Sequence, residues 1–314
     1  MPRLVKDGPL PVGARTVQVS SVAKPFFPDA GLTKGDLLAY YRDVAETMLP
    51  HLAGRPLNLQ RFPNGVNRRG FWQQGAADHF PDWVRTVTVE RRGRGGTVAH
   101  VVCEDAATIV YLANLATVTF HAWTSTVEHL ARPDLVILDL DPDPDQGLEV
   151  VRAAARAVRA AGEELGLVPF VQTSGSRGYH VVMPLVPGPD VEVVRDFAAE
   201  LAALVAARDP GRLSVEWRKE KRHGRLLLDT ARNGYAQTVV APYSVRPRPE
   251  APVATPIDWS ELGRVEPRTY TMANLRRRLA RKPDPWAGMA AEAVAFDPVR
   301  ARLDELLAEV GRRS

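Results

Sequence analysis

Apolar positions at helical spacing and apolar runs of strand length alternate along the chain, and this alternation predicts a mixed α/β fold. In residues 33–49 the apolar side chains recur at helical spacing, and Thr33 can cap that helix. The same pattern predicts further helices, which are expected at 105–116, 147–166, 190–208 and 272–282 and in the last 17 residues. Strands are expected at 56–62, 85–90, 97–102, 117–123, 135–141, 169–173, 179–184, 213–217 and 225–229.

Two connecting segments differ in composition from the rest. The basic, Gly-rich stretch RRGRGG (91–96) lies between two strand patterns and predicts a hairpin or mobile loop. The Pro-rich stretch 241–256 is expected to be an ordered loop over the surface rather than a core element.

The composition of the chain restricts the number of domains and the classes of function that are possible. The chain has 314 residues, 45% of them hydrophobic, which is enough for one large or two small domains. The formal net charge of +4 permits nucleic-acid binding without demonstrating it. The single cysteine, Cys103, excludes an intramolecular disulfide and a multi-cysteine zinc site. No signal-like start and no 18-residue apolar run occur, so we expect a cytoplasmic protein without a membrane partner.

The stretch LVILDLDPDPDQ (135–146) runs from a buried strand into alternating acids. Asp139 and Asp141 are two apart and therefore face the same side of an extended chain, and Pro142 should end the strand. Carboxylates this close repel one another unless a cation lies between them. A hard divalent metal such as Mg²⁺ or Mn²⁺ suits such oxygen ligands, and the alternative is an acidic surface turn.

Two familiar aspartate motifs fit this stretch poorly. An EF-hand loop that begins at Asp141 needs Gly and Glu where the chain has Gln146 and Arg152. Phosphatases of the aspartyl-phosphate type also begin with a hydrophobic residue and D-x-D, but Asp143 stands where Thr or Val is expected. That class is kept as a weak alternative.

A second acid, Asp229, ends a second apolar run, Leu226 to Leu228. If the two strands are neighbours, three carboxylates converge, which would suit a site for two metal ions. Asp229 could instead be a helix N-cap.

The segment TSGSRGYH (173–180) joins two strands through small residues that let backbone N–H groups approach an anion. Arg177 adds charge, and His180 could donate to a phosphate; the alternative is a Gly-rich hairpin with a structural histidine. Many cationic side chains lie near Asp229 in the sequence, and they would suit binding of a triphosphate. The alternative is that this charged run is simply a solvent-exposed face. These residues are Arg218, Lys219, Lys221, Arg222, His223, Arg225, Arg232 and Arg246.

Phe71 and Trp72 lie beside Arg68 and Arg69, a combination that suits stacking on unpaired bases. The two rings could equally be core aromatics, and His121 in TFHAW could be a core histidine.

Taken in order, DLDPD, TSGSRGYH and LLLD resemble the three motifs of the archaeo-eukaryotic primase superfamily. More specifically, the chain is similar to the polymerase domain of bacterial ligase D, which works in non-homologous end joining. SVAKPFFPDAGLTKGDLLAYYRDVA, RPLNLQRFPNG, GFWQQ, LANLATVTFHAW, RKEKR and QTVVAPYSVRPRPEAPVATPIDW carry this similarity across about 20–262.

The resemblance implies an α/β (α+β) primase-polymerase fold, with an RRM-like catalytic sheet flanked by helices and an N-terminal α/β module. We expect this domain to span 1–290, with the N-terminal module at about 1–130 and the catalytic sheet at about 131–265. A C-terminal helix would follow at 291–314.

The resemblance also implies a role for each matching residue. Asp139, Asp141 and Asp229 would hold two Mn²⁺ or Mg²⁺ ions. Nucleotide contacts would come from Ser174, Arg177, His180, Lys219, Arg232, Arg246 and His121, and Arg222 would act in the basic loop near the primer end. Lys24 and Lys34 would bind the 5′-phosphate of a DNA gap, and Phe71 and Trp72 would stack on the template base.

These roles imply a DNA-dependent nucleotidyltransferase with NTP or dNTP as substrate, a monomer that is nucleoid-associated when on DNA, with Ku and a DNA ligase as partners. Two positions depart from the expected pattern: Arg177 replaces a lysine, and Gln74 replaces another. Primer synthesis de novo and a non-catalytic DNA-end-binding module are the alternatives.

Overall fold

The computed structural model describes residues 4–93 and 95–313, and the chain forms two compact units. Unit 1 comprises 1–128, 238–255 and 268–283, and unit 2 comprises 129–237, 256–267 and 284–314. The modules expected from the sequence were continuous stretches, whereas the chain returns to unit 1 twice after residue 128. Each unit is described separately below.

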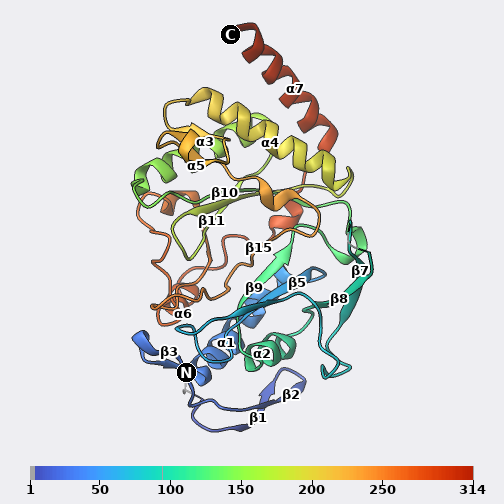
Figure 1. The fold of residues 1–314 in the computed structure, drawn as a ribbon, viewed down its shortest axis with the longest axis vertical. Coiled ribbons are helices and arrows are strands. Elements are labelled where there is room, and N and C mark those ends of the chain that lie inside the picture. The colour runs from blue at the N-terminus through green and yellow to red at the C-terminus, as the bar shows by residue number, and fades with distance from the viewer. Residues whose placement is uncertain (1–3, 94, 314) are drawn as a thin grey trace. The chain divides into compact units, whose positions relative to one another are not determined.

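Unit 1 is built on an antiparallel sheet (Figure 1). Its strand order is β15-β9-β5-β8-β7, and β6 also pairs with β5. These strands are β5 (Pro56–Arg61), β6 (Phe71–Gln73), β7 (Thr86–Glu90), β8 (Thr97–Val102), β9 (Thr117–Trp123) and β15 (Thr238–Val240). Two small pairs complete the unit: β1 (Gly8–Val12) with β2 (Arg15–Val19), and β3 (Pro25–Phe27) with β4 (Leu32–Thr33). The hairpin expected around 91–96 is confirmed by the pairing of β7 with β8; its Arg94 lies outside the described residues.

Helices α1 (Lys34–Leu52) and α2 (Ala106–Asn114) of unit 1 pack against each other. Thr33 caps α1 as the sequence predicts: its hydroxyl accepts from the Asp36 backbone N–H, and the Asp36 carboxylate accepts from Thr33 in return. The apolar stripe of α1 is fully buried, which places the core of this unit between the helices and the sheet.

The Pro-rich segment 241–256 was expected to be a surface loop, and this expectation is wrong. Tyr243, Val245 and Val253 are completely buried in the core of unit 1. The Tyr41 hydroxyl accepts from the Val245 backbone N–H at 3.0 Å, so a side chain satisfies a backbone donor of this irregular segment. The prolines break the regular ladder while the apolar residues between them still become buried.

The sheet of unit 2 has the strand order β10-β12-β11-β16. Its strands are β10 (Leu135–Leu140), β11 (Phe170–Thr173), β12 (Tyr179–Pro184) and β16 (Thr255–Ile257). The β10–β12 and β11–β12 pairs are antiparallel. Helices α3 (Leu148–Glu164) and α4 (Val191–Arg208) lie together on one side of this sheet (Figure 1), and both contact β10. The mixed α/β fold is therefore confirmed.

Shorter elements depart more from their expected lengths. The two strands expected at 213–217 and 225–229 are reduced to the parallel pair β13 (Leu213–Ser214) and β14 (Leu226–Leu227). The intervening cations form the one-turn helix α5 (Lys219–Arg222). The helix expected at 272–282 covers only α6 (Leu275–Leu279), and α7 (Phe296–Arg313) forms the expected C-terminal helix. Within the described part of the chain, no helix has the length and apolar character needed to cross a membrane.

Candidate active site

A row of four polar side chains crosses the sheet of unit 2 at one level. Antiparallel register places His180 of β12 between Asp139 of β10 and Gln172 of β11. On the other side of β10, Asp139 forms an isolated antiparallel bridge with Asp229. Residues paired directly across strands share a face of the sheet, so these side chains come from four segments onto one surface.

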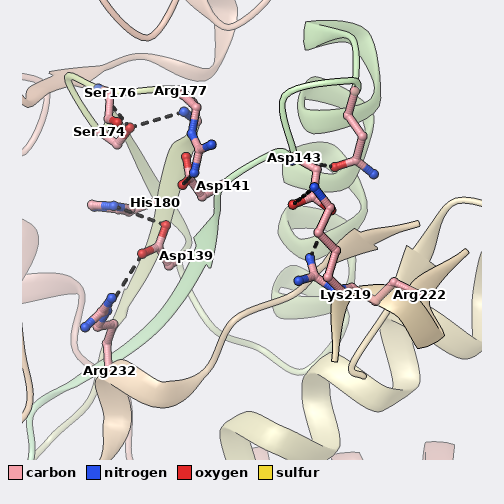
Figure 2. Close-up of polar contacts among 12 residues, drawn as sticks. Asp139, Asp141, Asp143, Ser174, Ser176, Arg177, His180, Lys219, Arg222 and Arg232 are labelled. Carbon is pink, nitrogen blue, oxygen red and sulfur yellow. Dashed lines mark hydrogen bonds and ion pairs between the residues drawn. The ribbon is translucent and has the colours of Figure 1, made fainter. Parts of the chain in front are cut away.

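Asp139, at the centre of this row, has two basic neighbours. His180 Nε2 lies 3.4 Å from Asp139 Oδ1, and Arg232 Nε lies 3.8 Å from Asp139 Oδ2 (Figure 2). Burial and the neighbouring Asp139 carboxylate raise the pKa of Asp229 above its ordinary value. The site therefore concentrates negative charge that a bound cation would relieve.

The carboxylate of Asp229 also accepts from the Ala231 backbone N–H at 2.7 Å. The following turn, Ala231–Asn233, starts directly after Thr230. The capping role considered for Asp229 is therefore partly present, through one oxygen, beside its place in the acidic row.

Asp141 lies at the end of β10, where the chain leaves the sheet. Its Oδ2 accepts from Arg177 Nη2 at 2.5 Å (Figure 2), and this contact raises the pKa of the Arg177 guanidinium. Its other oxygen, Oδ1, is buried and has no hydrogen-bond partner among the described residues. A buried carboxylate oxygen without a hydrogen-bond partner marks a place where a further ligand can bind.

The loop between β11 and β12 is fastened by one hydroxyl. Ser174 Oγ accepts from the backbone N–H groups of Ser176 and Gly178, each at 3.2 Å. Gly178 passes so close to β10 that an added Cβ would lie 1.7 Å from the Leu140 carbonyl oxygen. The loop thereby delivers Arg177 to the acidic end of β10.

The donor types at this edge fit a hard divalent cation, because they are carboxylate oxygens and one of them lacks a partner. However, no three His, Cys, Asp or Glu side chains within 4–93 and 95–313 gather closely enough to hold a metal ion together. Asp141 is paired with Arg177 in this arrangement. The metal-ligand roles of Asp139, Asp141 and Asp229 remain predictions.

The basic loop meets the acidic turn at Asp143. Asp143 receives Arg222 Nη1 at 3.4 Å and Lys219 Nζ at 3.6 Å (Figure 2). Gln146 adds a hydrogen bond from its amide to the Gly224 carbonyl at 2.7 Å. Asp143 thereby anchors the loop that carries Lys219 and Arg222.

Two further residues were missed by the sequence analysis. Asn233 is fully buried, and its side-chain amide both accepts from and donates to the backbone of Ile137, at 2.8 and 2.7 Å. It thus continues the pairing of β10 where no further strand is present. The second is Gln172, whose amide meets His180. Neither carries charge, and only the long-range register reveals them.

The two lysines expected to bind a 5′-phosphate lie close together in unit 1. Lys34 Nζ donates to the Ser20 carbonyl at 2.7 Å, and Lys24 Nζ donates to the Pro63 carbonyl at 2.5 Å. Burial, opposed by the charge of Asp7 and assisted by that of Lys24, lowers the pKa of Lys34 to about 8. The cluster is thus an electropositive place that favours an anion.

Phe71 and Trp72 form part of the exposed surface of unit 1, with 47% and 53% of their areas accessible, so they are not core aromatics. The Trp72 ring meets the His121 ring edge-on, with centroids 4.7 Å apart. Arg61 lies over the Phe71 ring at 5.3 Å. Arg246 also belongs to unit 1, where its backbone N–H donates to the Pro252 carbonyl at 2.7 Å.

The sheet, its acidic edge and the serine-fastened loop together have the features of a primase-polymerase domain, and comparisons with known proteins define the family. The model of the LigD primase-polymerase domain matches residues 33–286. The chain belongs to this family.

The chain is similar to the multifunctional non-homologous end joining DNA repair protein LigD of Mycobacterium tuberculosis, with 33% identity over 293 residues. It is also similar to the LigD proteins of Pseudomonas aeruginosa, at 30% identity, and Bacillus subtilis, at 27%. The matches cover 87 to 94% of this chain, but the chain spans only 33 to 46% of these relatives.

A solved structure gives the same result. The polymerase domain of Mycobacterium tuberculosis ligase D, in complex with DNA, superimposes with a TM-score of 0.82 at 30% identity. The match covers 88% of this chain and 99% of that one. The fold expected from the sequence is therefore confirmed.

Proposed function

We propose that this chain is a DNA-dependent nucleotidyltransferase that adds nucleotides to primer 3′ ends at gaps and double-strand breaks in end-joining repair. The observation that carries the proposal is the bridge between Asp139 and Asp229, which sets two carboxylates side by side at the edge that also holds Asp141. A purely DNA-binding module has little use for carboxylates grouped beside a phosphate backbone.

The residues of this edge divide into two chemical groups. Asp139, Asp141 and Asp229 would hold two divalent cations, Mn²⁺ or Mg²⁺, and bound metal would lower the pKa of the primer 3′-hydroxyl and neutralise phosphate charge. Cationic and hydrogen-bonding groups surround them: Ser174, Arg177, His180 and Arg232 would bind and orient the triphosphate.

The reaction is an in-line displacement in which the 3′-hydroxyl oxygen attacks the α-phosphorus. The new phosphodiester bond forms as the bond between the α-phosphorus and the α–β bridging oxygen breaks, the hydroxyl proton passes to solvent, and pyrophosphate leaves with the electron pair. Arg177 and Arg232 can neutralise the charge that develops on the phosphates. Arg177 is paired with Asp141, so it would exchange that carboxylate for a phosphate when substrate binds.

The basic loop would guide the primer. Lys219 and Arg222 are fixed to Asp143, which holds the loop beside the acidic turn. In unit 1, Lys24 and Lys34 would receive a 5′-phosphate, and Phe71 and Trp72 offer exposed rings for an unpaired template base. His121 and Arg246 of unit 1 would add contacts to the nucleotide. The DNA complex of the similar ligase D domain supports DNA as the partner.

The proposal has a direct test. Primer extension is measured on a short gapped duplex with a 5′-phosphate, with Mn²⁺ or Mg²⁺ and with ribo- or deoxyribonucleotides, for the wild type and Asp139→Ala. We expect metal-dependent extension that Asp139→Ala abolishes while DNA binding persists. Extension by Asp139→Ala, or no extension by the wild type despite tight binding to the gap, would refute the proposal.

A further inference from the structure

The row of four polar side chains across the sheet of unit 2 includes one neutral residue, Gln172, to which the proposed mechanism assigns no role. Gln172 on β11 pairs in register with His180 on β12, which in turn pairs with Asp139 on β10. The Gln172 amide nitrogen lies 3.0 Å from His180 Nδ1, and His180 Nε2 lies 3.4 Å from Asp139 Oδ1. Gln172 and His180 retain 1% and 4% of their accessible areas, so water does not compete for these contacts.

The first contact defines where the ring proton resides. An amide nitrogen can only donate, so Nδ1 of His180 must accept with its lone pair. A neutral imidazole carries one proton, which is therefore on Nε2, the nitrogen that faces Asp139. The opposite tautomer would set an N–H against the amide hydrogens at one end of the ring. At the other end it would set a lone pair against a carboxylate oxygen.

We propose that Gln172 is a positioning residue that holds His180 in its Nε2–H tautomer, with that hydrogen directed at the acidic edge. A donor fixed in this way orients the Asp139 carboxylate through Oδ1 and keeps a hydrogen bond available for an anionic ligand. Partners of this kind, one step behind the groups that bind metal or substrate, commonly fix ring orientation and tautomer. The catalytic part of this inference rests on the proposed nucleotidyltransferase function, whereas the assignment of the tautomer is independent of that function.

The tautomer can be read without any activity. Nitrogen-15 NMR of the histidine rings, in the protein without nucleotide and at a pH where the ring is neutral, distinguishes protonated from bare ring nitrogens. For His180, assigned with His180→Asn, we expect a protonated Nε2 and a bare Nδ1. A protonated Nδ1 and a bare Nε2 in the wild type would overturn the inference.

Two variants of Gln172 separate hydrogen bonding from shape. Gln172→Glu keeps the size but replaces the donor by an acceptor, so Nδ1 is expected to become protonated. Gln172→Met removes the hydrogen bond and should leave a mixture of tautomers. In both, extension should fall by about ten- to a hundredfold, the usual effect of losing such a partner. The fall should appear in kcat more than in KM for the primer.

The matched control is Val171→Ala on the same strand. Val171 is as buried as Gln172 but pairs with Val181, so its truncation loosens packing and leaves the polar row intact. We expect a lower Tm, an unchanged His180 tautomer and near wild-type extension. If Val171→Ala reduces extension as much as the Gln172 variants, or if those variants leave both tautomer and rate unchanged, Gln172 has no positioning role. If the wild type shows the expected tautomer but no extension, the proposed function fails and the tautomer assignment stands.

Discussion

Asp139 and Asp229 exchange both backbone hydrogen bonds, at 2.9 and 3.1 Å, although Asp139 lies in a six-residue strand and Asp229 belongs to no strand. This two-residue bridge sets a second carboxylate beside the first. It also explains why the pKa of Asp229 is raised, because burial and a like charge both disfavour its ionised form.

The raised pKa gives a test of Asp229 that separates function from stability. An aspartate whose pKa is higher in the folded chain loses stability as pH rises through that pKa, so its charged form destabilises the fold at neutral pH. Asp229→Asn removes the charge and keeps the oxygen that accepts from Ala231. We expect the Tm of the protein without metal to stay equal or rise. Extension should fall roughly 10³-fold, since bound metal supplies several kcal/mol to such reactions. A clear drop in Tm, by scanning calorimetry, would contradict this reasoning.

Gly178 should tolerate no side chain. The Cβ of Gly178→Ala would lie 1.7 Å from the Leu140 carbonyl oxygen, so β10 and the loop must separate, at a cost of about 1–3 kcal/mol by analogy with overpacked cores. Gly211→Ala in the same unit is the control, because nothing lies within 4 Å of its added Cβ. Urea unfolding should show a lower midpoint for the first variant and little change for the second. Equal midpoints would mean that the strand edge adapts easily.

Arg177 is expected to compete with metal for Asp141. Arg177→Gln frees that carboxylate, so the Mn²⁺ affinity measured by calorimetry should rise several-fold. This factor corresponds to the free energy usually contributed by one surface ion pair. The KM for nucleotide should rise about tenfold or more, because one charge-assisted hydrogen bond to phosphate is lost. Arg177→Lys keeps the charge and should retain most activity. Weaker metal binding by Arg177→Gln would argue that this side chain supports the metal site.

Lys34 should make recognition of the 5′-phosphate depend on pH. With a pKa of about 8 it loses its charge in a range where the phosphate stays ionised, so preference for a phosphorylated gap should fall between about pH 7 and 9. Lys34→Arg should abolish that dependence, since a guanidinium stays charged.

Lys34 should affect folding in the opposite sense. Between its folded pKa of about 8 and its ordinary 10.5, the unfolded chain binds more protons, so this lysine raises the unfolding free energy with pH. DNA binding and urea titrations across the same pH range test both statements. If the preference for a 5′-phosphate does not change with pH, or persists in the double variant Lys24→Ala with Lys34→Ala, the phosphate-binding pocket lies elsewhere.

Trp72 is expected to contribute to DNA affinity but not to the stability of the fold. Its ring is 53% exposed, so Trp72→Ala should leave Tm nearly unchanged while affinity for a gapped duplex falls by about 1–3 kcal/mol, the usual value of one stacked base. Trp72→Phe keeps an aromatic face and should retain most of the affinity. Fluorescence anisotropy on gapped and blunt duplexes would reveal the difference. Equal losses on both would mean that the ring does not read the gap.

Local signals were sufficient for much of this architecture. The strand that carries Asp139, the cap at Thr33 and the long helices follow from periodicity and end residues, which are properties of neighbouring positions. The Pro-rich segment was misjudged because prolines suggest a loop, whereas its burial depends on tertiary packing around Tyr243 and Val245.

The candidate site shows the same division. The acids and the Ser-Gly loop were visible as motifs, but the partners that fix them were not. Gln172, Asn233 and Asp143 acquire their roles through contacts with residues 8, 96 and 79 positions away. No local pattern of residue types encodes those separations, so only the folded register identifies them.

The chain crosses between its two units at five points, after residues 128, 237, 255, 267 and 283. Consequently neither unit is a contiguous piece of the gene, and no single pair of start and stop codons would produce either one. A protease that cuts one crossing would leave both halves of the chain contributing to at least one common unit. Laboratory dissection of this protein therefore has to proceed by point substitution rather than by truncation.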